Sequence, residues 1–123
     1  MFDPLDFLKL ASELQGAGQD ESKLRTSIGR AYFSVFLFSR EWLKAKGWPF
    51  NNSGGDHGSA EQGLKKNVDR ATGDMLGSLR RTNRGDADYD LSKPITQGDA
   101  TTAIALANTI ISNINTKSKP VTP

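Results

Sequence analysis

Residues 20–47 of the chain read DESKLRTSIGRAYFSVFLFSREWLKAKG, and this stretch predicts one long helix around which the rest is organised. Asp20 is a good N-cap because its carboxylate can accept hydrogen bonds from the free amides of the first turn. Gly47 is a natural end point because glycine enters the left-handed conformation without strain. At 1.5 Å per residue, such a helix is roughly 40 Å long.

The apolar residues of this stretch recur every three or four positions, as a helix with a buried face requires. They are Leu24, Ile28, Ala31, Tyr32, Val35, Phe38 and Trp42. Phe33, Phe36 and Leu37 lie off this line, so the middle of the helix is apolar nearly all round. A helix of this kind must be buried on several sides. We therefore expect it either at the centre of a bundle or against a second subunit.

Three further helices are predicted on the two sides of this stretch. Asp3-Pro4 opens the first, with Asp3 as cap and proline at the first helical position, where its missing N–H costs nothing. The next is predicted to begin near Ser59, after a loop rich in glycine, proline and asparagine. The last begins at Thr96, with Asp99 as its capping-box partner.

The fold class predicted from these segments is all-α, as an antiparallel up-and-down four-helix bundle. Residues 1–116 are expected to form a single domain, since 123 residues are enough for one core but not for two. The polar residues 117–123 are expected to form a flexible tail. Glycines Gly73 and Gly77, four apart in the third helix, either weaken that helix or allow a neighbour to pack closely.

Composition excludes several classes of protein. The chain has no cysteine, so it has neither disulfides nor thiolate chemistry. Its N-terminus is acidic where a signal peptide is basic, and no apolar run is long enough to span a bilayer. We therefore expect a cytoplasmic protein that does not enter membranes. A formal net charge of +2 is too small to indicate nucleic-acid binding, which must depend on where the arginines lie.

Metal and cofactor chemistry find little support in the sequence. A single histidine, His57, and the absence of cysteine leave almost no zinc site. The run DADYD resembles the start of a calcium loop, but Leu91 and Gln97 stand where that loop needs glycine and glutamate. No metal and no cofactor are therefore expected. Nothing in the sequence places a serine beside His57, and a lone histidine in a loop is usually a surface residue.

The remaining candidate is the segment LRRTNRGDADYD, the densest charge pattern in the chain. Arg80, Arg81 and Arg84 are candidate phosphate ligands because a guanidinium group can bind a phosphate with two hydrogen bonds. Arg30 joins them from the central helix. Because it lies among apolar neighbours, it needs either a bound anion or a carboxylate partner. Three aspartates are candidates for that structural pairing: Asp86, Asp88 and Asp90.

At these residues the chain resembles the HEPN family, in particular its small stand-alone prokaryotic members. The matching features are Arg30-Ala-Tyr-Phe-Ser-Val-Phe on a long helix, a glycine-bearing loop with Asp-His-Gly, and Arg84-x-x-Ala-Asp-Tyr-Asp. Together they extend over about residues 5–115. The resemblance implies a helical bundle that dimerises through its central faces. It also implies a role in prokaryotic toxin–antitoxin or defence systems, often beside a small nucleotidyltransferase partner.

Many HEPN proteins are metal-independent ribonucleases whose signature is an arginine, four to six residues, and a histidine. Here Arg84 is followed after four residues by Tyr89, so the chain departs from the nuclease pattern at the acid–base residue. Tyrosine has a reference pKa near 10 and is a poor general base at neutral pH. It can still donate a hydrogen bond or stack on a nucleobase.

The sequence therefore leaves three functional hypotheses. The first is a homodimeric HEPN module that binds RNA, a nucleotide or a partner protein through the arginine-rich motif. The second is an active ribonuclease, in which Arg84 stabilises the phosphorane, Tyr89 positions an oxygen and His57 transfers the proton. The third is a purely structural dimerisation module.

Overall fold

The computed structural model describes residues 1–16, 18 and 20–118, and all regular structure within them is helical. The prediction of an all-α chain is confirmed over these residues. The elements are α1 (Leu5–Gln15), α2 (Glu21–Ala45), α3 (Asp56–Asn67), α4 (Arg70–Ser78), the π-helix η1 (Leu79–Arg84), α5 (Gly85–Tyr89) and α6 (Gln97–Ser118).

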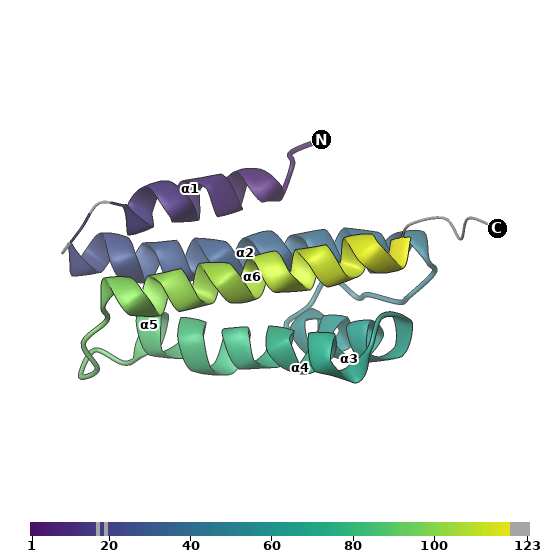
Figure 1. The fold of residues 1–123 in the computed structure, drawn as a ribbon. Coiled ribbons are helices and arrows are strands. Elements are labelled where there is room, and N and C mark those ends of the chain that lie inside the picture. Colours follow the sequence, from purple (N-terminus) through teal and green to yellow (C-terminus); the bar gives the residue numbers. More distant parts are fainter. Residues whose placement is uncertain (17, 19, 119–123) are drawn as a thin grey trace.

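Helices α2 and α6 lie at the centre and run in the same direction (Figure 1). Helix α1 covers one side of them and runs the opposite way, and α4, η1 and α5 return along the other side. Helix α3 packs beside α4 and contacts α2. None of the described helices is both long and apolar enough to cross a membrane.

The predicted helix ends are largely confirmed. Asp20 caps α2, with its carboxylate accepting from the backbone N–H groups of Ser22 at 3.1 Å and Lys23 at 3.4 Å. Gly47 has a φ of +85°, the left-handed conformation that favours glycine after a helix. At the start of α6, the N–H of Thr96 donates to the Asp99 carboxylate at 2.8 Å, and the Asp99 N–H donates back to the Thr96 hydroxyl at 3.2 Å.

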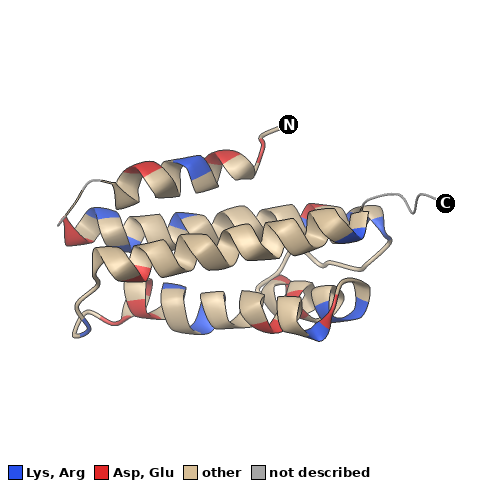
Figure 2. Cartoon of the chain, viewed as in Figure 1, with Lys and Arg blue, Asp and Glu red and all other residues tan. Residues whose placement is uncertain are grey.

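One hydrophobic core joins the described helices. Helix α2 contributes the largest set of buried side chains, including Tyr32, and α6 faces it with small and branched residues such as Ala103 and Ile110. Figure 2 shows that α6 and the middle of α2 carry few charges, whereas charged residues gather at helix ends and on the outer helices. This distribution is what a helix that is apolar nearly all round requires.

The predicted third helix differs from the structure at both ends and in its middle. Helix α3 begins at Asp56, whose carboxylate accepts from the N–H groups of Asn51 and Ser53, so Ser59 is an interior residue rather than a cap. The helix then breaks at Val68. Asp69 restarts it as the N-cap of α4, because its carboxylate accepts from the Thr72 N–H at 2.8 Å.

The arginine-rich segment is also more regular than the sequence indicated. Residues 79–89 continue α4 as η1 and α5. A six-residue π-helix is rare, and short π segments often lie at functional sites. Helix α6 includes Lys117 and Ser118, the first two residues of the predicted tail. The rest of that predicted tail lies outside the described residues.

Candidate functional site

The site begins with His57, which lies on the first turn of α3 and faces α2 rather than occupying an open loop. Its Nδ1 is 2.5 Å from the Tyr32 hydroxyl, and its ring stacks on Phe36 with centroids 4.3 Å apart. Tyr32 is fully buried. A histidine held between two aromatic side chains of the central helix has a fixed orientation, which a surface histidine lacks.

Both ionisable groups of this pair have displaced pKa values. Burial lowers the pKa of His57, and Arg80 and Arg84 lower it further because a second cation nearby is unfavourable. Burial raises the pKa of the Tyr32 hydroxyl well above its usual range. Near pH 7 the imidazole is therefore neutral and the phenol protonated. When the phenol donates to Nδ1, the imidazole carries its proton on Nε2, where it is a hydrogen-bond donor.

Arg84 is the last residue of η1, and its side chain lies over the same Tyr32 ring, with the guanidinium carbon 5.4 Å from the ring centroid. Its Nε donates to the Asp88 carboxylate at 3.0 Å, and its Nη2 donates to the Tyr89 hydroxyl at 3.2 Å. Tyr89 itself is largely exposed. Of the three residues that the ribonuclease hypothesis names, Arg84 contacts Tyr89 directly, and His57 is joined to Arg84 through Tyr32.

The two other arginines of η1 share one buried carboxylate. The Glu61 side chain is 7% exposed, and its Oε1 accepts from Nη1 of Arg81 at 2.8 Å. Its Oε2 lies 3.4 Å from Nε of Arg80 but accepts no hydrogen bond among the described residues. Arg81 is therefore committed to Glu61, whereas Arg80 is held more loosely, beside His57. We call His57, Tyr32, Arg80, Arg84 and Tyr89 the Arg84 cluster.

Close packing of α3 on α4 makes this arrangement possible. A Cβ atom at Gly77 would lie 2.7 Å from Oε1 of Glu61, and one at Gly73 would lie 2.6 Å from the Glu61 carbonyl oxygen. Both distances are shorter than real Cβ contacts. Of the two interpretations of this glycine pair, the structure confirms the close approach of a neighbouring helix.

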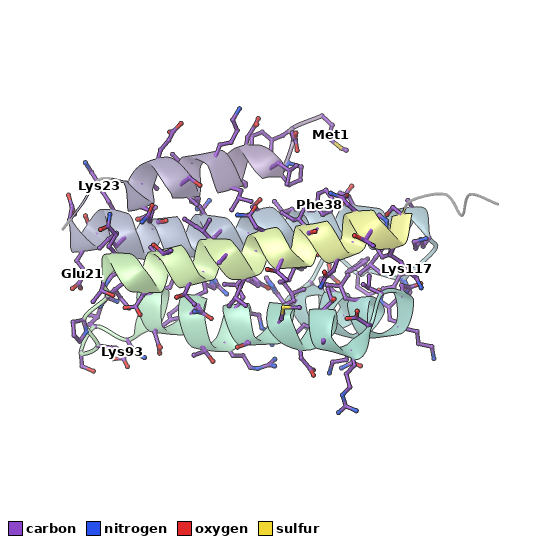
Figure 3. All side chains as sticks on the ribbon, viewed as in Figure 1. Met1, Glu21, Lys23, Phe38, Lys93 and Lys117 are labelled. Atoms are coloured by element: carbon purple, nitrogen blue, oxygen red, sulfur yellow. The ribbon has the colours of Figure 1, made fainter. Side chains whose placement is uncertain are left out.

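Arg25, which the sequence did not single out, anchors the end of the motif. Its Nη1 donates to the backbone carbonyls of Asp86, Ala87 and Asp90 at 2.9–3.1 Å, and its Nη2 donates to that of Lys93 at 2.6 Å. These carbonyls include the free acceptors at the end of α5, which no helical N–H can reach. The Glu21 carboxylate accepts a hydrogen bond from Arg25 Nε at 2.9 Å. Glu21 and Lys93, both partners of Arg25, lie at the same end of the molecule (Figure 3).

The predicted pairing of Arg30 with the aspartates is wrong. Its guanidinium carbon lies over the rings of Phe7 and Phe33, 5.2 Å from each centroid. The carboxylates have other partners: Arg84 for Asp88, Lys93 for Asp86 and Ser92 for Asp90. The sequence pattern correctly placed a cation among apolar neighbours, but a flat guanidinium on aromatic rings can be stabilised without a carboxylate.

Two other observations bear on what the site can do. Among the described residues, no group of three or more His, Cys, Asp or Glu side chains is placed to hold a metal. A groove of about 510 Å³ lies between α1 and α6 and is lined by residues such as Leu5, Lys9 and Ile111. In the Arg84 cluster, Tyr89 is the exposed member, whereas the Arg84 side chain is 18% exposed and Tyr32 is buried.

The comparisons with known proteins assign no family. No family model matches this sequence. No solved structure matches it either. Over 46 residues it is 50% identical to the uncharacterized protein MJ0628 of Methanocaldococcus jannaschii, and the match covers 36% of this chain and 28% of that protein. The chain therefore matches little more than a quarter of this relative's length.

Proposed function

We propose that the chain is a HEPN-like module that binds an RNA or nucleotide phosphate at the Arg84 cluster. The observation that carries this proposal is that Arg84 and His57 both contact Tyr32, Arg84 over the ring and His57 at the hydroxyl. Guanidinium groups and an Nε2–H are hydrogen-bond donors of the kind that a phosphate accepts from, and a phosphate would share Arg84 with the Asp88 carboxylate. The exposed Tyr89 ring supplies a surface on which a base can stack.

The fold supports the same proposal. Helices α1, α2, the α4–η1–α5 run and α6 alternate in direction along the chain, with α3 as an added element (Figure 1). This alternation supports the proposal of a helical bundle like that of HEPN proteins. We extend the proposal to a homodimer that acts in a prokaryotic toxin–antitoxin or defence system. A nucleotidyltransferase or another antitoxin is the partner to look for among the neighbouring genes.

A second candidate function, a metal-independent ribonuclease, is favoured by one observation. Tyr89 replaces the histidine of the nuclease signature. However, α3 brings another histidine, His57, to Tyr32, the ring that Arg84 covers. In the tautomer that donates from Nδ1 to the Tyr32 oxygen, Nε2 is free to accept the proton of an attacking 2′-hydroxyl. Cleavage of RNA in EDTA that His57→Gln abolishes supports this candidate over simple binding.

The proposed function is tested by titrating labelled RNA at two salt concentrations. Arg84→Lys keeps the charge but loses the planar fork, so we expect it to weaken binding almost as much as Arg84→Ala. Arg70→Ala is the matched control, because Arg70 lies at the start of α4 with its side chain 88% exposed. Equal affinities for the wild type and all three variants would show that Arg84 is an ordinary surface residue.

A further inference from the structure

A row of aromatic and guanidinium groups runs from the N-terminal residues across α1 and α2 to η1 and α5, where it joins the Arg84 cluster. In order, its members are Phe2, Phe7, Arg30, Phe33, Arg84 and Tyr89. Successive members are 4.8–5.5 Å apart, measured between ring centroids or from a guanidinium carbon to a ring centroid. We call this set the aromatic–arginine row.

The row remains accessible along its length. Its two ends are the most open, with Phe2 56% and Tyr89 72% exposed, and the four members between them are half-buried. The ring of Phe33 lies within 5.4 Å of two guanidinium carbons, those of Arg30 and Arg84.

The charge of the row is not balanced. Asp88 pairs with Arg84, but none of the ion pairs among the described residues includes Arg30. Asp3, just before α1, and Asp6 on α1 line the groove toward α6, whereas Phe7 contacts Arg30 of α2. Two guanidinium groups that share one ring repel each other, so an anion placed across the row is favoured.

We propose that the aromatic–arginine row is a stacking platform for single-stranded RNA that extends the phosphate site of the Arg84 cluster. Unpaired bases stack on aromatic rings and guanidinium planes, and the backbone phosphates follow the arginines. A duplex keeps its bases stacked on one another, so it cannot use the platform. This inference rests on the proposed function, and it adds that the ligand is a strand of several nucleotides rather than a free nucleotide.

The test compares a labelled single-stranded 12-mer RNA, its duplex, and AMP as a competitor. The variants are Arg30→Met and Phe7→Leu on the row, and Arg84→Ala in the cluster. Lys46→Met is the matched control, because Lys46 lies over Trp42 at 4.6 Å in a cation–π contact that is not part of the row. Melting curves verify that each variant folds.

We expect Arg30→Met and Phe7→Leu each to weaken binding of the single strand at least about fivefold, the lower end for loss of one stacked base. Competition by AMP should be unchanged in these two variants and lost in Arg84→Ala. Lys46→Met should bind the strand as the wild type does. The duplex should bind more weakly than the single strand.

The failures of the two proposals are distinguishable. The platform is overturned if both row variants bind the strand with wild-type affinity, or if the duplex binds as tightly as the single strand. Phosphate binding at the cluster still stands in that case if Arg84→Ala fails to bind. Absence of binding by the wild-type chain overturns both.

A 2-aminopurine base in the 12-mer gives a readout that needs no variant: stacking quenches its fluorescence, and an unquenched complex contradicts the platform. Row variants that dissociate a dimer without changing RNA affinity show a protein interface and also overturn it.

Discussion

His57 illustrates how the surroundings of one residue change its chemistry. In the sequence it is a lone histidine among glycines, with no local partner. In the structure it lies in the first turn of α3, and its Nδ1 faces the buried hydroxyl of Tyr32, 25 residues earlier in the sequence. Arg80 and Arg84 act on its pKa. Its neutral form at pH 7 follows from burial and from these cations, neither of which local spacing reveals.

This environment predicts a pH dependence of stability. The folded-state pKa of His57 lies below the unfolded value of about 6.5, so the unfolded state binds more protons as the pH falls. The free energy of unfolding should therefore decrease from about pH 6.5 down to the folded-state pKa. Glutamine keeps a hydrogen-bonding side chain but does not titrate. Urea unfolding at pH 7.5 and 5.5 should show a smaller loss in His57→Gln than in the wild type, and equal losses would contradict the pKa direction.

Arg25 and Arg30 show which parts of the site the sequence could predict. The arginines at positions 80, 81 and 84 were evident from the charge pattern of the segment, and Tyr89 from its spacing after Arg84. The contacts of Arg25 were not, because its carbonyl partners lie 61–68 residues away and no residue type marks a backbone acceptor. Arg30 was predicted to pair with a carboxylate because a buried cation needs a counter-charge, whereas two aromatic rings from different helices contact it.

At the scale of elements, long periodic segments were predictable and interruptions were not. Helices α1, α2 and α6 carry clear caps and a steady apolar spacing, and the structure has them within about two residues of the prediction. The break at Val68 was missed because the apolar line Leu64, Val68, Ala71 continues through it. Only Asp69, as an N-cap followed by Thr72, signals the restart.

The contact between α3 and α4 gives a prediction at this scale. Alanine at Gly73 should favour the helix by about 1 kcal/mol, but its Cβ would lie 2.6 Å from the Glu61 backbone carbonyl oxygen, so α3 itself would have to shift. We expect the clash to dominate, so Gly73→Ala should lower the melting temperature. Gly58→Ala is the matched control, because its Cβ would enter open space on α3 and should raise stability. Equal stabilisation by both substitutions would show that α3 moves aside without cost.

For the whole molecule, the prediction concerns assembly. The homodimer was expected because Phe33, Phe36 and Leu37 exceeded the needs of one core face. The chain itself buries Phe36, which is 4% exposed beneath His57 and Arg40. Phe33 and Leu37 remain half-buried. We still expect light scattering at micromolar protein to give twice the chain mass, and a monomer mass that does not change with concentration would contradict the dimer.

The central claim is that phosphate binds where His57, Arg80 and Arg84 converge. An NMR titration of the ¹⁵N-labelled chain with a short RNA tests this most directly, because the arginine Nε–H and imidazole signals report on the binding groups themselves. The account predicts saturable shifts of Arg80, Arg84 and His57, with Arg70 unchanged. Shifts confined to other surfaces, such as the groove between α1 and α6, or no shifts at all, would contradict it.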